Sequence, residues 1–265
     1  MRPVQIHSLS NEHNIPDAST HRNQWIQRFS AGEPLPVPLV RVYLCGALSI
    51  EVLCDLQTAP DGTLTPIYNS PEEAPAFSTG ERHGVRKRPK SVSTARNLLK
   101  LLVSQPGRFA AKDWLIEQLR RPQREEEDED LIGSGGLARF DNVVALLRGL
   151  LCPVGIGETE SLRKRLVKLV TTTPRSGDGY RLAPYPLIWV DVDALTTHAQ
   201  RACALEAEGH DALHEWQAAY TLGMRGPVLQ EEVYSDWAQI WREEIEGYLW
   251  QSVQALWRHA LSRGQ

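Results

Sequence analysis

The chain has 265 residues, of which 42% are hydrophobic, and a formal net charge of −4 at pH 7. This length and composition favour a folded protein with a substantial core and two domains. The four cysteines form no CxxC pair, which argues against a zinc site or a disulfide framework. No apolar run approaches the roughly 20 residues that span a bilayer, and the N-terminus does not resemble a secretory signal. We therefore expect a cytoplasmic protein without membrane contact.

Charge is distributed unevenly along the chain. Residues 80–183 hold 20 Lys and Arg against 13 Asp and Glu, a net charge of +7. Residues 1–79 hold 4 Lys and Arg against 8 Asp and Glu, and residues 184–265 hold 5 Lys and Arg against 12 Asp and Glu. A basic block between two acidic ones indicates a local site for a polyanion. The alternative is a solvated basic face without a ligand.

The N-terminal region combines an extension with a small sheet. Residues 1–38 are polar and lack sustained periodicity, so we expect a partly disordered extension. Short strands are predicted at Leu39–Leu44 and Leu48–Leu53, with a break at Gly46. A third strand is predicted at Leu64–Tyr68, after a turn.

Three helices and a hairpin are predicted within the basic block. The first helix begins at Ser91 or Ser93, the second spans about Ala111–Leu119, and the third spans about Leu137–Leu151. In the segment Leu166–Leu182, two runs rich in Val, Leu, Thr and Tyr flank a Pro-Arg-Ser-Gly-Asp-Gly turn, which predicts the hairpin. This order is typical of a winged helix-turn-helix domain, in which the third helix enters the major groove of DNA. We assign it to residues 39–184.

An acidic segment interrupts this domain between the second and third helices. Glu125–Asp130 reads EEEDED and lies in an insert at residues 123–136 that ends in a glycine-rich run. Six like charges in succession repel one another, so we expect a loop. It is either a solubilising insert or a surface that contacts basic partners.

The last part of the chain is predicted to be helical. Val192–Glu208 and Asp211–Leu222 form a plausible antiparallel pair, and a longer helix spans about Ser235–Ser262. Packed helical hairpins of this kind are typical of tetratricopeptide-like domains. The expected fold class is therefore an α+β winged helix-turn-helix with a small β-sheet, followed by an all-α domain over residues 187–265.

Five motifs in this order resemble the SARP-type transcriptional regulators, a response-regulator-type winged helix followed by a bacterial transcriptional activator domain. The segments that carry the resemblance are Leu44–Val52 (LCGALSIEV), Leu98–Leu119, Val144–Leu151, Leu169–Leu182 and Gly226–Glu244 (GPVLQEEVYSDWAQIWREE). The resemblance implies an activator that binds double-stranded DNA and contacts RNA polymerase or a sigma factor. A homodimer is a further partner to consider. Asp141 departs from the family, whose groove-facing helix is richer in Arg and Gln.

The candidate DNA contacts follow from this order of elements. Arg139, Asn142 and Arg148 on the third helix are predicted base contacts, and Arg175 at the hairpin turn is the predicted minor-groove contact. Phosphate neutralisation should supply most of the affinity. The predicted phosphate contacts are Arg86, Lys87, Arg88, Lys112, Arg163, Lys164, Arg165 and Lys168. The alternative interpretation is that each of these cations is an ordinary solvated surface charge.

Enzyme chemistry finds little support in the sequence. His210 and His214 are four residues apart, but no glutamate lies between them as a metalloprotease would need. No phosphate-binding glycine loop or nucleophile elbow is present. We therefore expect no enzymatic activity, no cofactor and no metal. The competing hypothesis is a protein-interaction subunit in which the winged helix is a docking module with little DNA binding.

Overall fold

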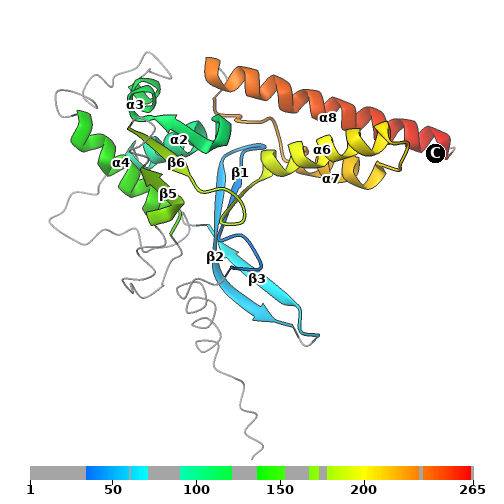
Figure 1. The fold of residues 1–265 in the computed structure, drawn as a ribbon, viewed down its shortest axis with the longest axis horizontal. Coiled ribbons are helices and arrows are strands. Elements are labelled where there is room, and N and C mark those ends of the chain that lie inside the picture. The colour runs from blue at the N-terminus through cyan, green and yellow to red at the C-terminus, as the bar shows by residue number, and fades with distance from the viewer. Residues whose placement is uncertain are drawn as a thin grey trace, which may run out of the picture.

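The computed structural model describes residues 34–59, 61–70, 90–120, 136–152, 167–172, 178–232 and 235–263. These residues form a mixed α/β structure with six α-helices and two small β-sheets. Figure 1 shows three parts: a sheet with a projecting hairpin, a group of helices beside a second sheet, and an arm of three helices. One hydrophobic cluster includes buried residues from all three parts.

The first sheet has four strands. They are β1 (Val40–Tyr43), β2 (Ser49–Thr58), β3 (Leu64–Asn69) and β7 (Ile188–Val190), in the order β3-β2-β1-β7. β2 is antiparallel to both of its neighbours, whereas β7 is parallel to β1. The turn between β1 and β2 contains Gly46 at a φ of +87°, which glycine adopts without strain. The three strands predicted from the sequence are confirmed, and β2 is longer than predicted.

Three helices and a second sheet follow in the chain. The elements are α2 (Lys90–Ser104), β4 (Phe109–Ala111), α3 (Lys112–Arg120), α4 (Gly136–Leu150), β5 (Val170–Thr172) and β6 (Gly179–Leu182). The sheet is antiparallel in the order β4-β6-β5. α2 packs against α4 and against β6. The hairpin β5–β6 is joined through β6 to β4, which lies between α2 and α3 in the chain.

The arm consists of α6 (Asp191–Ala207), α7 (Leu213–Gly223) and α8 (Asp236–Ser262). α7 packs against both α6 and α8, and the three predicted helical segments are confirmed. At Gly223 a Cβ atom would overlap a methyl carbon of Leu249 on α8. The absence of a side chain at this position therefore lets α7 and α8 approach closely.

The start of α6 is anchored to the turn between β1 and β2. The Asp191 side chain is fully buried, and its carboxylate accepts hydrogen bonds from the backbone N–H groups of Leu44 (2.8 Å) and Cys45 (2.9 Å). A third bond, of 2.8 Å, comes from the N–H of Val192. One carboxylate thus satisfies backbone donors from two parts of the chain that are far apart in sequence.

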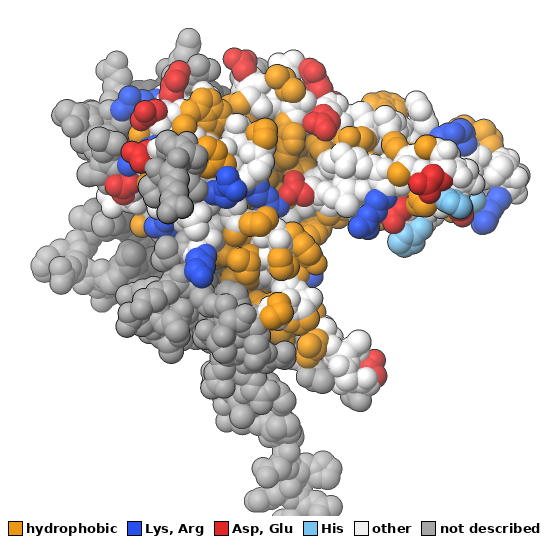
Figure 2. Space-filling model, in the orientation of Figure 1, with side chains coloured by type: hydrophobic (Ala, Val, Ile, Leu, Met, Phe, Trp, Pro, Cys, Tyr) orange, Lys and Arg blue, Asp and Glu red, His pale blue; other side chains and the backbone are white. Residues whose placement is uncertain are grey.

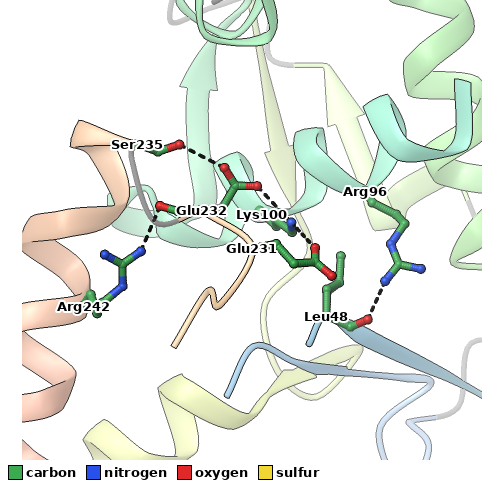
Figure 3. Close-up of polar contacts among 7 residues, drawn as sticks. All are labelled: Leu48, Arg96, Lys100, Glu231, Glu232, Ser235 and Arg242. Carbon is green, nitrogen blue, oxygen red and sulfur yellow. Dashed lines mark hydrogen bonds and ion pairs between the residues drawn. The ribbon is translucent and has the colours of Figure 1, made fainter. Parts of the chain in front are cut away.

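The segment between α7 and α8 is attached to both the sheet and α2. Cys45 and Val228 form an isolated antiparallel bridge. Next to it, the buried Lys100 ammonium of α2 pairs with Glu231 at 2.6 Å and with Glu232 at 2.9 Å (Figure 3). Glu232 also accepts a hydrogen bond from the Ser235 hydroxyl. These contacts fix the arm to the preceding helices.

Two strands and two details of the hairpin differ from the sequence-based expectations. β4 and β7 were not predicted, because a three-residue strand carries little periodicity and depends on a distant partner. A 3-10 turn at Val167–Leu169 precedes β5 where a continuous strand is expected. Gly179 lies in β6 rather than at the turn, and a Cβ there would lie 2.5 Å from the ring of Phe109. Its role is to allow β6 to pack on that ring.

Candidate nucleic-acid interface

The structure describes the side chains of four predicted DNA contacts: Lys112, Asn142, Arg148 and Lys168. Arg139 lies in α4, but its side chain is outside the described set. The remaining predicted contacts lie outside the described residues; they are Arg86, Lys87, Arg88, Arg163, Lys164, Arg165 and Arg175. The described part of the candidate interface therefore consists of α3, α4 and the paired parts of the hairpin.

The packing of α4 leaves one side of the helix exposed. Phe140, Val144 and Leu147 are buried and recur at spacings of four and three, so they face α2 and the core. Asn142 is exposed on another side of the helix. The described part of α4 thus presents a polar amide where base readout is predicted.

Asp141 joins α4 to α3 and to the hairpin. Its Oδ1 atom lies 3.2 Å from the Lys112 ammonium and accepts a 3.0 Å hydrogen bond from the Tyr180 hydroxyl. The Tyr180 ring also packs on Phe140, with ring centroids 5.4 Å apart. The departure from the family pattern at Asp141 therefore has a structural role. The same contact gives Lys112, a predicted phosphate contact, a partner within the protein.

These contacts shift the pKa values of both acidic partners. Hydrogen bonds from Lys112 and Tyr180 lower the pKa of the Asp141 carboxyl below its ordinary value. Burial, together with the hydrogen bond to Asp141, raises the pKa of Tyr180 to about 12. The carboxylate is thus ionised and the phenol protonated at neutral pH, which is the pairing that the geometry requires.

Arg148 is held by the protein itself. Its Nε and Nη2 atoms both donate to the backbone carbonyl of Val170, at 3.0 and 2.7 Å. Val170 opens β5, so Arg148 links the end of α4 to the hairpin. This position differs from the base contact predicted from sequence, because the acceptor belongs to a residue that is distant in the chain and no local pattern reveals it.

Among the described residues, two exposed cations lie beside the hairpin. Lys168, a predicted phosphate contact, is exposed just before β5. Arg181 is exposed on β6 and lies over the Phe109 ring, 5.6 Å from its centroid. The sequence reasoning missed Arg181, although it lies between the buried residues Tyr180 and Leu182, and period-two alternation would place it on the outer face. Around these helices, Figure 2 shows basic and acidic side chains interspersed on the visible face.

Replacing Asp141 with asparagine should lower the free energy of unfolding at pH 7 by up to about 1 kcal/mol, because the Asp141 side chain in the pair with Lys112 is largely exposed. The folded-state pKa of Asp141 lies below its ordinary value. The contribution of Asp141 to the free energy of unfolding is therefore present above that ordinary pKa and is lost as pH falls through the folded-state pKa. Urea titrations at pH values about one unit apart, between pH 2 and pH 7, measure this effect. The free energies of unfolding of wild type and variant should converge in acid. Glu244→Gln, which changes an exposed carboxylate on α8, serves as the control. If Glu244→Gln lowers the free energy of unfolding as much as Asp141→Asn does, the structural role assigned to Asp141 is wrong.

Two histidines on the arm lie close to carboxylates. His198 Nδ1 lies 2.6 Å from Glu215 Oε2, which links α6 to α7, and this contact lowers the pKa of Glu215. His210 lies 3.8 Å from Glu208. Among the described residues, no group of three or more His, Cys, Asp or Glu side chains is arranged to hold a metal ion.

Comparisons with protein-family models, with curated proteins and with solved structures found no match to the chain. In the part of the chain that the structure describes, every helix is too short or too polar to cross a membrane.

Proposed function

We propose that this chain is a sequence-specific DNA-binding transcriptional regulator that acts as an activator. In this proposal α4 enters the major groove, and the β5–β6 hairpin contacts the adjacent minor groove. The observation that carries it is the order and pairing of the elements between Lys90 and Leu182. A winged helix-turn-helix typically has a helix, a short strand and two further helices, followed by a hairpin that pairs with the short strand.

The side chains around α4 support the same proposal. Asn142 is exposed where an amide can pair with the edge of adenine. Lys168 and Arg181 add exposed positive charge at the hairpin. Asp141 does not present an unpaired negative charge to DNA, because Lys112 and Tyr180 already bind it. The role of Asp141 is then to set the angle of α4 relative to the hairpin.

The helical arm is the proposed contact for RNA polymerase or a sigma factor. It resembles a tetratricopeptide-like activator domain in the order of its helices, and residues 184–265 carry a net charge of −7. The contacts of Asp191 and Lys100 hold this acidic arm in a fixed position beside α2.

A protein-interaction subunit is the second candidate. It is favoured by the internal contacts of Lys112 and Arg148, two of the four predicted DNA contacts whose side chains are described. If the basic block neutralises no phosphate, affinity for DNA should be weak and nearly independent of salt. The two candidates therefore differ in one measurable quantity.

Binding of the full chain to promoter-length duplex DNA across a salt series tests the proposal. The logarithm of the association constant should fall linearly with the logarithm of salt concentration. Lys168→Ala should weaken binding to every sequence and reduce that slope by about one. Asn142→Ala should cost about 1–3 kcal/mol, roughly 5- to 150-fold, on the preferred sequence while leaving the slope unchanged.

Gln217→Ala is the matched control for Asn142→Ala, because it removes an exposed amide from a helix of the arm. It should leave both affinity and slope unchanged. A flat salt response of the wild-type chain, or no binding at low salt, contradicts the proposed function and favours the interaction subunit.

A further inference from the structure

Arg108 has an unusual backbone conformation at the junction between α2 and β4. It ends a 3-10 turn, Pro106–Arg108, and adopts a positive φ of 55° directly after Gly107, whose φ is 62°. This left-handed conformation is unfavourable for a residue that carries a Cβ atom. The contacts of the Arg108 side chain therefore have to offset the cost of its backbone.

The Arg108 guanidinium binds acceptors from three segments of the chain. Its Nη1 atom donates to the backbone carbonyls of Ala183, at 2.7 Å, and Ile188, at 3.0 Å. Its Nη2 atom pairs with the Asp193 carboxylate. The Arg108 side chain is only 11% exposed, so these bonds form largely out of water, where they are stronger. A guanidinium can bind several acceptors at once because its donors point in different, fixed directions.

The acceptors of Arg108 belong to different parts of the molecule. Ala183 follows β6, and its N–H extends the pairing between the two strands of the hairpin by one bond. Ile188 is the first residue of β7 in the first sheet, and Asp193 lies in the first turn of α6 in the arm. On the other side, Arg108 directly precedes Phe109, which pairs with β6. The backbone of Arg108 is thus attached to the sheet of the hairpin, whereas its side chain reaches the first sheet and the arm.

We propose that Arg108 is a positioning residue that couples the hairpin to the arm, so that DNA bound at α4 and the hairpin slows the opening of the start of α6. This inference rests on the proposed function. DNA that holds the hairpin also holds Ala183, and Ala183 and Asp193 share one guanidinium. Such coupling is reciprocal, so a closed start of α6 favours the DNA-bound hairpin to the same extent. Promoter binding would thereby order the arm for its protein partner.

The connection can be broken at the arm without unfolding the protein. The Asp193 side chain is 47% exposed, so Asp193→Asn should cost little stability. The buried Asp191 carboxylate still holds the start of α6 to the β1–β2 turn in this variant. Both bonds from Arg108 to backbone carbonyls also remain, so the affinity for DNA should stay close to that of the wild type. Asp236→Asn is the matched control, because Asp236 is an exposed acid in the first turn of another arm helix, α8.

Hydrogen exchange of the full chain, with and without a duplex that it selects from a random pool, tests the proposal. In the wild type, DNA should slow exchange in α4 and the hairpin, where it binds. It should also slow exchange about 5-fold or more in the first two turns of α6. Asp193→Asn and Arg108→Ala should keep the slowing in α4 and the hairpin but lose it in α6. Asp236→Asn should behave as the wild type does.

The outcomes separate this coupling from the proposed function. Slowing in α4 and the hairpin of the wild type, without slowing in α6, overturns the coupling and leaves DNA binding in place. Slowing in α6 that persists in Asp193→Asn overturns it as well, because DNA then acts on the arm by another route. An equal loss in Asp236→Asn has the same consequence. If the chain selects no duplex, the proposed function is wrong and the coupling is wrong with it.

Discussion

Replacing Asp191 with alanine is expected to destabilise the protein by about 3 kcal/mol or more, because three buried N–H groups lose their acceptor and each costs about 1–3 kcal/mol. The three donors are the backbone groups of Leu44, Cys45 and Val192. They connect the β1–β2 turn to the first turn of α6. The variant should therefore loosen the arm from the sheet as well as lower overall stability.

Urea unfolding followed by tryptophan fluorescence measures this effect. Asp236→Ala is the matched control, because Asp236 is an exposed acid in the first turn of α8. Its loss removes a helix-dipole interaction of about 0.3–1 kcal/mol. Equal losses in the two variants would contradict the anchoring role of Asp191. Hydrogen exchange should further show faster exchange in the first turn of α6 in Asp191→Ala only.

The second large effect is expected at Lys100. Its ammonium group is buried between Glu231 and Glu232, and the Glu232 side chain is buried with it. Lys100→Met keeps most of the aliphatic packing but leaves the Glu232 carboxylate without its cation. Breaking a buried ion pair in this way costs about 3–5 kcal/mol.

A double variant separates charge from packing at this junction. Lys100→Met/Glu232→Gln removes both buried charges and should recover a large part of the stability lost in Lys100→Met. Glu231→Gln should cost less than about 1 kcal/mol, since half of that side chain is exposed. Thermal or urea unfolding of the four proteins provides the comparison. No recovery in the double variant would show that the buried charge is not the source of the loss.

The helices could be predicted from sequence because their cause is local. The Leu-rich stripe of α2 and the three- and four-residue spacings in α8 specify both the element and its buried side. The same holds for β1 and β2, where the apolar runs and Gly46 mark the strands and the turn. In each case the residues that determine the element lie within it.

The contacts of the candidate site could not be predicted because they join distant residues. Arg148 reads as an accessible cation until Val170 is placed beside it, 22 residues later. Asp141 reads as an unfavourable charge until Lys112 and Tyr180 are seen to bind it. Asp191 likewise carries no local signal for the turn at Leu44, 147 residues earlier. Side-chain charge is visible in a sequence, whereas its neutralisation depends on the fold.

The central claim is that α4 and the hairpin read a DNA sequence. Selection of duplex DNA from a random pool by the purified full chain, followed by sequencing, tests it most directly. We expect enrichment of a defined motif, and we expect Asn142→Ala to relax the preference at one position of that motif while Gln217→Ala leaves it intact. Recovery of a pool no different from the starting one would contradict sequence recognition by this chain.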